Sequence, residues 1–419
     1  MKILPSKIYY GWWVVGAAAG AQFGNAATAI NILTIFVLPM SAEFGWSRTE
    51  VSAATSVGAI LGAVLAPFSG RLIDRIGSRV ILTVGASLVV CACIGLSFVS
   101  TLLGFYIAFT IARSAEQGLV QVGAAPVVAK WFLRYRGRAM SIIFFASAAG
   151  MIITAPLVQW IIVELGWRSA WLVLAVNMFV LGAIPCLIFI RRSPEDLGLE
   201  IDGGDSYGPD GVTTSVRDQE VAWGMREVVH TFSFWAILAS LFIAAVCTSG
   251  VGLHLIPYLV DQNIAPGVAV SVISVMSISG AVSAIVLGVL SEKVSPRFMM
   301  GSIYLLAALS LVVLLNTNIA LIAYGFAILN GIVGVGVNTL APILWAKYYG
   351  RDSVGSIYGV SRSVQVMGFA IGPLASGLVY DTFGSYEKAL TWFAVVSLLS
   401  VVLIGFARRP VKITPKLKA

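Results

Sequence analysis

The sequence predicts an all-α membrane protein with twelve transmembrane helices in two pseudo-symmetric six-helix bundles. Hydrophobic residues make up 58% of the 419 residues and charged residues only 11%, whereas a soluble domain carries about 25% charged residues. The apolar residues gather in runs of roughly 20 or more, which is the length that crosses a bilayer as a helix. Several short motifs of the first half also recur in the second half in the same order.

Each apolar run is expected to form a helix, because in lipid the backbone must satisfy its own hydrogen bonds. The first run begins near Tyr10 and has no small-residue cleavage site, so it is expected to be a span and not a secretory signal. The four cysteines lie inside apolar runs without metal-ligand spacing, so no metal site and no cofactor are expected. The expected spans are 11–39, 51–70, 79–99, 102–129, 138–163, 168–190, 232–260, 268–290, 298–316, 319–346, 354–380 and 387–407.

Most of the 27 lysines and arginines fall on one side of the membrane when these spans are threaded through it. Only Arg48, Arg168 and Lys388 fall on the opposite side, and Arg113 and Arg362 lie inside spans. The positive-inside rule therefore predicts that both termini are cytoplasmic and that the protein resides in the inner (cytoplasmic) membrane of the cell. The net charge of +8 is accounted for at the membrane surface, so no nucleic-acid partner is expected.

A polar, acidic and glycine-containing segment over 191–229 separates the first six spans from the last six. Its composition is typical of a linker, and the threading places it in the cytoplasm. The predicted domains are an N-terminal bundle over 1–190, the linker over 191–229 and a C-terminal bundle over 230–419.

The two halves carry traces of one repeated design. "GRLIDRIGSR" occupies 70–79 and "GVLSEKVSPR" occupies 288–297, with Gly, Leu, an acid, a base and a final Arg in the same order. The same offset in residue number pairs Pro39 with Pro257, each near the outer end of the first span of its half. Six helices per copy keep both copies in one orientation, so the repeats are expected to be parallel and related by an axis along the membrane normal.

These motifs resemble a known family of transporters. "GRLIDRIGSR" resembles the loop signature of the major facilitator superfamily, and "IARSAEQG" resembles the arginine motif of its fourth helix, with one extra residue before Gln117 and Gly118. "KWFLRYRGRAMSI", "HTFSFW", "HLIPYLVD" and "YGVSRSVQVMGFAIGPLASGLVYDTFGSY" resemble the monocarboxylate-porter and oxalate/formate-antiporter branch. The resemblance covers essentially the whole chain and implies the major facilitator fold, in which two bundles rock around a central site. We expect a monomer.

The resemblance implies that the repeated loop latches the bundles together on the cytoplasmic side. Gly70 and Gly77 are expected to permit tight turns. Asp74 is expected to cap the N-terminus of the eleventh helix, whose dipole favours an anion, and also to pair with Arg138. Glu292 is expected to play the matching part at the start of the fifth helix, unless these charges serve only to set the topology. The predicted latch residues are Gly70, Asp74, Arg75, Gly77, Arg79, Arg138 and Glu292.

Charged side chains inside spans are costly and therefore mark candidate functional sites. Arg113 and Arg362 belong to opposite halves, and two guanidinium groups facing one cavity can bind a carboxylate. Alternatively, each arginine braces its own bundle, and Glu116 at the third position after Arg113 can neutralise it. Glu116 lies deep inside a span, where burial favours the neutral carboxyl, so it is the predicted proton carrier. A permanent pair with Arg113 is the alternative.

Further polar side chains are expected to line the substrate pathway. Gln117 and Gln121 follow Arg113 along one face of the fourth helix. A second polar stripe steps by three along the first helix and comprises Gln22, Asn25, Thr28 and Asn31. Interhelical hydrogen bonds would explain both stripes equally well. His254 and Tyr258 are four residues apart near the outer end of the seventh span, where His254 is a gate, a proton site or a structural histidine. The predicted substrate-binding residues are Arg113, Arg362, Asn31, Gln117, Gln121, Gln365, His254 and Tyr258.

The sequence departs from the monocarboxylate-porter branch in its eighth span. Those porters carry an Asp–Arg pair there, whereas "VAVSVISVMSISGAVSAIVLGVL" has no charge. Either Arg362 and Arg113 take over anion binding, or the substrate is not a simple monocarboxylate. The fifth span reads "GMIITAPLVQ" and lacks the Gly-Pro-x-x-Gly-Gly pattern of drug/proton antiporters, which weakens the interpretation as an exporter.

The predicted function is secondary active transport of a small organic anion, a carboxylate in the first instance, by alternating access with proton symport. The expected partners are that anion, protons and the lipid bilayer. The alternatives are a transporter of a larger planar metabolite or vitamin, an exporter of metabolites or drugs, and, more remotely, a non-transporting membrane sensor. No nucleophile–base pair or nucleotide-binding loop supports an enzyme.

Overall fold

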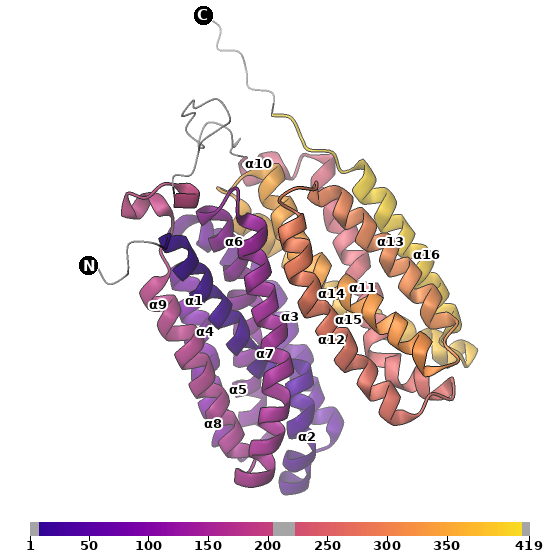
Figure 1. Ribbon diagram of the computed structural model, residues 1–419. Coiled ribbons are helices and arrows are strands. Elements are labelled where there is room, and N and C mark those ends of the chain that lie inside the picture. The colour runs from indigo at the N-terminus through magenta and orange to yellow at the C-terminus, as the bar shows by residue number, and fades with distance from the viewer. Residues whose placement is uncertain (1–7, 204–222, 413–419) are drawn as a thin grey trace, which may run out of the picture.

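The computed structural model describes residues 8–203 and 223–412, which form helices joined by short connections (Figure 1). The middle of the predicted linker lies outside the described residues. The helices of the first half are α1 (Tyr10–Gly24), η1 (Asn25–Thr28), α2 (Ile30–Phe44), α3 (Arg48–Ile76), α4 (Ser78–Ser97), α5 (Leu102–Ala115), η2 (Glu116–Val120), α6 (Gln121–Trp131), α7 (Arg136–Leu165), α8 (Trp167–Met178), η3 (Phe179–Ala183) and α9 (Ile184–Phe189). The helices that follow are the short η4 (Pro194–Leu197), η5 (Ile201–Gly203) and α10 (Met225–Val228), and then α11 (Phe232–Asp261), α12 (Pro266–Leu290), α13 (Pro296–Leu315), α14 (Ala320–Tyr349), α15 (Val354–Phe383) and α16 (Glu387–Phe406).

Eleven helical segments of the described chain are long and apolar enough to cross a membrane. The other predicted span, the fourth, runs through α5, η2 and α6 and is less apolar because it carries Arg113 and Glu116. Many large apolar side chains point outward, such as Phe98, which is 76% exposed, and Leu321, which is 74% exposed. Lipid rather than water is the solvent that matches such a surface. The predicted all-α membrane fold is therefore confirmed.

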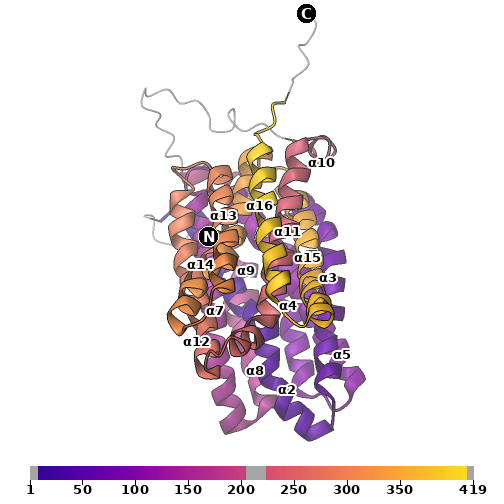
Figure 2. The ribbon, with the colours of Figure 1, turned by 90° about the vertical axis from the view of Figure 1, so that its right-hand side faces the viewer.

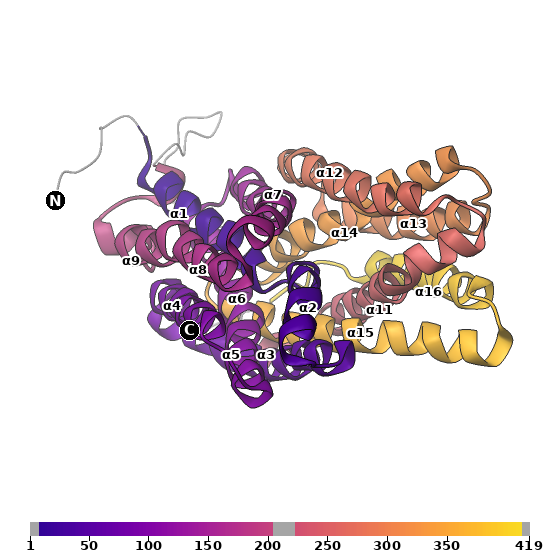
Figure 3. The ribbon, with the colours of Figure 1, turned by 90° about the horizontal axis from the view of Figure 1, so that it is seen from below.

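The helices form two bundles that stand side by side (Figures 1 and 3). The N bundle contains α1 to α9 and the C bundle contains α11 to α16; in Figure 2 the C bundle stands in front. Figure 1 shows the two bundles converging at the end where α1 begins and α16 ends, and diverging toward the opposite end. We call the first end the termini side; the charge distribution predicts that it is cytoplasmic.

Close backbone contact joins α3 of the N bundle to α15 of the C bundle near the termini side. A Cβ added to Gly70 would run into the carbonyl oxygen of Gly355, and one added to Gly359 would run into that of Ala66. Gly70 lies inside α3, which continues to Ile76, so the expectation that Gly70 permits a tight turn is wrong. Its missing side chain instead allows the two helices to touch backbone to backbone.

The second contact between the bundles repeats the first. A Cβ added to Gly288 in α12 would run into the carbonyl oxygen of Gly137 in α7, and the reverse holds for Gly137. Gly288 stands at the offset from Gly70 that relates the two sequence repeats, and Gly355 stands at the same offset from Gly137. The pseudo-symmetry of the sequence is therefore also a symmetry of the contacts that hold the bundles together.

Substitution of Gly70 by Ala is expected to weaken the α3–α15 contact, because the added methyl group must push α15 away. Overpacking of this kind costs about 1–3 kcal/mol, which corresponds to roughly a 5- to 150-fold shift between two conformations. Spin-label distances between the ends of α3 and α15 on the termini side should lengthen. Gly252→Ala in α11 is the control, because a Cβ there meets no atom within 4 Å. An unchanged distance distribution in Gly70→Ala would contradict the assignment.

Candidate functional site

Two irregular helical segments meet inside the N bundle. The first predicted span is interrupted after Thr28, because Ala29 is extended with ψ 148° before α2 begins. The fourth contains the π-helical turn η2 over Glu116–Val120. A π turn holds more residues than an α turn, and it accommodates the extra residue noted in "IARSAEQG". Irregular backbone at this depth is tolerated only where protein buries it or where it lines a cavity.

An ion pair lies where these segments meet. Arg113 Nη1 is 2.6 Å from Glu116 Oε2, and both residues are buried, with 8% and 3% of their surface exposed. The same Nη1 donates to the carbonyl oxygen of Thr28 at 3.2 Å. The break at Ala29 explains why this carbonyl is available, since the helix does not continue past it. A buried ion pair needs such additional hydrogen bonds to offset the loss of water.

The other oxygen of the Glu116 carboxylate accepts three further hydrogen bonds. Its donors are the side-chain amides of Asn25 at 3.5 Å, Gln117 at 3.1 Å and Gln121 at 3.3 Å. The polar stripe predicted on the fourth helix therefore converges on Glu116. The two helical interruptions bring these groups together, and neither interruption was predicted.

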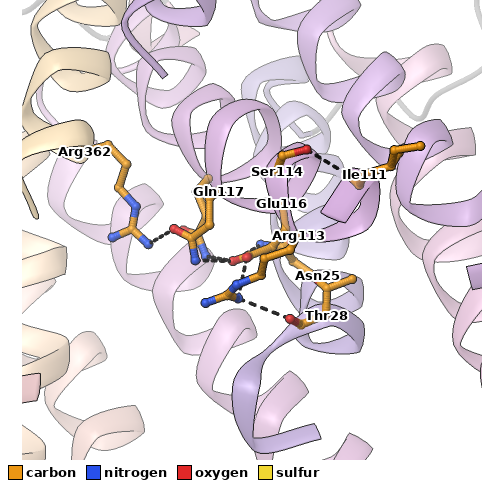
Figure 4. Close-up of polar contacts among 9 residues, drawn as sticks. Asn25, Thr28, Ile111, Arg113, Ser114, Glu116, Gln117 and Arg362 are labelled. Carbon is orange, nitrogen blue, oxygen red and sulfur yellow. Dashed lines mark hydrogen bonds and ion pairs between the residues drawn. The ribbon is translucent and has the colours of Figure 1, made fainter. Parts of the chain in front are cut away.

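Arg362 of α15 extends this arrangement into the C bundle (Figure 4). Its Nη2 donates to Gln117 Oε1 at 2.7 Å and its Nη1 donates to Gln365 Oε1 at 3.2 Å. Hydrogen bonds thus run without interruption from Arg362 through Gln117 and Glu116 to Arg113. We call this set, with Asn25, Gln121 and Gln365, the central cluster.

The central cluster holds two guanidinium groups and one carboxylate. Arg362 is 8% exposed, and among the described residues its hydrogen-bonded side-chain partners are glutamines. The Nε atoms of Arg113 and Arg362 are buried and make no hydrogen bond within the described structure. A buried excess of positive charge with spare donors favours an anion, and a carboxylate can accept from two such donors at once.

The structure does not bring all predicted substrate-binding residues to the central cluster. Tyr258 is 3% exposed and donates to the carbonyl oxygen of Leu314, so it belongs to the core of the C bundle. The ring nitrogens of His254 lie 3.3 Å from the carbonyl oxygen of Pro373 and 3.1 Å from the hydroxyl of Tyr386. The substrate-binding role expected for these two residues is therefore not supported; both are tied to their own bundle. The side chain of Asn31 lies outside the described part of the structure.

Asp74 joins the bundles on the termini side. Its carboxylate accepts from the backbone nitrogens of Gly355 at 2.9 Å and Ser356 at 2.7 Å, and from the Ser356 hydroxyl at 2.6 Å. These groups stand at the start of α15, where a helix favours negative charge. Asp74 thus makes the capping contact with the N-terminus of α15 that the sequence suggested. Ser356 was missed, although a serine in the first turn of a predicted helix is a recognisable signal.

Glu292 makes the equivalent contact at the start of α7. Its Oε1 accepts from the backbone nitrogen of Arg138 at 3.0 Å, and its Oε2 lies 3.1 Å from Arg138 Nε. The additional pairing expected between Asp74 and Arg138 is wrong in this conformation, because Arg138 pairs with Glu292 while Asp74 binds the start of α15.

The remaining residues of the predicted latch lie around the turn after α3. Gly77 has φ 89°, a value that glycine adopts readily, and it begins the turn into α4 as expected. Arg79 Nε donates to the carbonyl oxygen of Leu187 in α9 at 3.0 Å, which is a contact inside the N bundle. Arg75 is exposed. Within the described residues, neither Arg75 nor Arg79 makes a hydrogen bond or ion pair between the two bundles.

Comparison with known proteins identifies the family to which this two-bundle chain belongs. The family model described as Major Facilitator Superfamily matches residues 18–360 and 255–419. The chain belongs to the major facilitator superfamily. Among curated relatives, monocarboxylate transporter 12-B of Danio rerio is 23% identical over 97% of this chain and 90% of its own length. The uncharacterized MFS-type transporter YcxA of Bacillus subtilis is 24% identical over 89% of each chain.

Solved structures of the superfamily share the fold. FucP, captured in an outward conformation, gives a TM-score of 0.72 at 14% identity over 96% of this chain and 100% of its own. The human organic anion transporter MFSD10 gives a TM-score of 0.70 at 14% identity, with the same coverage. At this identity the similarity establishes the fold alone, so the role of the central cluster must be argued from its own geometry.

Replacement of Asp74 by Asn is expected to loosen the termini side without unfolding the protein. Hydrogen bonds to a charged group contribute about 1.5–3 kcal/mol each, and the neutral amide retains only part of this, so the equilibrium should shift by roughly tenfold. Single cysteines placed along the α3–α15 contact should become easier to label from the termini side. Asp381→Asn, at an exposed position near the other end of α15, is the control. Equal labelling of Asp74→Asn and wild type would show that Asp74 does not hold the bundles together.

Proposed function

We propose that the protein is a secondary active transporter that moves a small organic anion, a carboxylate in the first instance, together with a proton. The observation that carries this proposal is the central cluster, where a buried guanidinium group from each bundle lies on one chain of hydrogen bonds with Glu116. An anion held there would contact both bundles at once, as a site shared between rocking bundles requires.

Charge balance gives a reason for coupling to a proton. With Glu116 ionised, the two arginines leave the central cluster with one excess positive charge. If a monoanion and a proton on Glu116 enter together, the cluster again carries one positive charge. The substrate carboxylate would then replace the Glu116 carboxylate beside Arg113, and the net charge at the centre of the membrane would be the same before and after binding.

The conformation suits the alternating-access part of the proposal. The bundles touch on the predicted cytoplasmic side through Asp74 and Glu292 and diverge on the other side (Figure 1). This is the outward-facing arrangement if both termini are cytoplasmic. Arg362 and the capped start of α15 belong to one helix. A change in the partners of Arg362 would therefore reach the contact at Ser356 through a rigid element.

The names of relatives agree with an anionic substrate. Monocarboxylate transporter 12 of Rattus norvegicus is 22% identical over 95% of this chain and 85% of its own length. The aspyridones efflux protein apdF of Emericella nidulans, 23% identical over 80% of this chain, keeps efflux of a larger metabolite as the second candidate. Counterflow with a panel of labelled carboxylates distinguishes the two, since only the first candidate predicts exchange of small acids.

Substitution of Glu116 by Gln tests the proton. A permanently neutral side chain should abolish uphill, proton-driven transport and leave exchange of substrate across the membrane in place. Both activities are measured in liposomes, with and without a pH gradient. Glu164→Gln, at the outer end of α7, serves as the control. Loss of both activities to the same degree, in protein that is still inserted, would identify Glu116 as a structural partner of Arg113 only.

Substitution of Arg362 tests the anion site. Arg362→Lys keeps the charge but loses the planar fork, so affinity should fall by about one to two orders of magnitude, the effect of a charged hydrogen bond of about 1.5–3 kcal/mol. Arg362→Ala should abolish the binding. Substrate-induced thermal stabilisation of purified protein measures both. If Arg362→Ala binds the transported acid as tightly as wild type, Arg362 only braces the contact with Gln117.

A further inference from the structure

A strongly basic pocket of about 540 Å³ opens between the two bundles on the termini side, away from the central cluster. It lies where α7 begins and where α12, α14 and α16 end. Glu292 is its only carboxylate among the described lining residues. The basic side chains that line it are Arg134, Arg136, Arg138, Lys293, Lys347 and Arg409.

Little of this positive charge is balanced within the pocket. Glu292 is already paired with Arg138. Lys293, Lys347 and Arg409 are exposed and make no ion pair within the described structure. These three belong to the C bundle and Arg134 belongs to the N bundle, so beside the pair of Arg138 and Glu292 the two bundles face each other with charges of the same sign. Arg409 and Arg136 are near enough to Lys347 to repel its charge.

A second pocket between the bundles shows that this excess of positive charge is not a general property of the termini side. That pocket, of about 330 Å³, lies beside the Asp74 contact and carries both signs in nearly equal number. Its charged lining residues are Asp74, Lys130, Arg192, Glu195, Asp196, Arg351 and Asp352. The α3–α15 contact beside Asp74 and the α7–α12 contact beside Glu292 are equivalent in the repeat but differ in their surrounding charge. Of the two, the contact beside Glu292 is the one whose excess positive charge favours binding of an anion.

The position of the basic pocket indicates where that anion comes from. The last residues of α12 and α16, Leu290 and Phe406, are 42% and 65% exposed, so apolar surface reaches to the pocket's level. Tyr135 lies beside it, with the guanidinium carbons of Arg134 and Arg138 at 5.4 Å and 5.2 Å from its ring centre. Basic groups and an aromatic ring above exposed apolar helix ends are typical of the headgroup level of a bilayer.

We propose that this pocket binds the phosphate of an anionic phospholipid headgroup. The bound phosphate lies between Arg134 and Arg138 of the N bundle and Lys347 and Arg409 of the C bundle and removes their mutual repulsion. Because the pocket exists only while the bundles touch on this side, the lipid favours that conformation over the one with the termini side open. The lipid composition of the membrane then sets the balance between the two states.

The test compares purified protein in nanodiscs of phosphatidylcholine alone with nanodiscs that also contain phosphatidylglycerol. Phosphatidylglycerol should raise the melting temperature of the wild type and lower the labelling of cysteines along the α3–α15 contact from the termini side. The double variant Lys347→Ala/Arg409→Ala should bind phosphatidylglycerol at least about tenfold more weakly, since it loses two charged contacts. The control Arg71→Ala/Lys388→Ala removes the same net charge outside the pocket and should behave as wild type.

Three outcomes would overturn the proposal. The first is an equal response to phosphatidylglycerol in the double variant and in the wild type. The second is an equal loss of response in the control, which would mean that overall charge and not the pocket attracts the lipid. The third is full reproduction of the effect by inorganic phosphate in phosphatidylcholine nanodiscs, which would make a free anion the ligand.

Discussion

The arrangement of the N bundle depends on the buried ion pair between Arg113 and Glu116. Two charges at the centre of a membrane protein are stable only when further hydrogen bonds replace the lost water. The chain supplies them by departing from regular helix twice, at Ala29, which leaves the Thr28 carbonyl available, and at the π turn that begins with Glu116. The same two departures orient the side-chain amides toward the carboxylate. The most polar point of the bundle is thus also the point where its helices are least regular.

Sequence reasoning recovers the parts of this structure that follow from hydrophobic length and from the repeat. The spans could be placed because each is a long apolar run, and the caps of Asp74 and Glu292 because an acid beside a helix start has a defined electrostatic reason. Gly70 was misassigned because a glycine inside a helix contact and a glycine in a turn look alike in one sequence. The substrate-binding role expected for Tyr258 is not supported, because spacing along a helix does not say which neighbouring helix that face contacts.

The central cluster was predicted in its residues but not in its geometry. Arg113 and Glu116 could be paired because residues three apart share a helix face. The bond from Arg362 to Gln117 crosses between helices that are distant in sequence, so no local pattern reports it. The break after Thr28 lies inside one continuous apolar run, so hydropathy carries no information about it. The extra residue in "IARSAEQG" was the one local sign of the π turn.

The two bundles share a fold but contribute unequally to the central cluster. The N bundle supplies both members of the ion pair and most of the amides around them, whereas α15 of the C bundle supplies Arg362 and Gln365. The helix of the C bundle that corresponds to the fourth span, α14, runs as one regular helix without a π turn. Within the central cluster, the irregular backbone that holds the buried pair therefore belongs to the N bundle, whereas Arg362 and Gln365 project from a helix without such a turn. Substitutions at these two positions would change the charge and hydrogen bonding of the cluster while leaving the two helical interruptions around Arg113 and Glu116 in place.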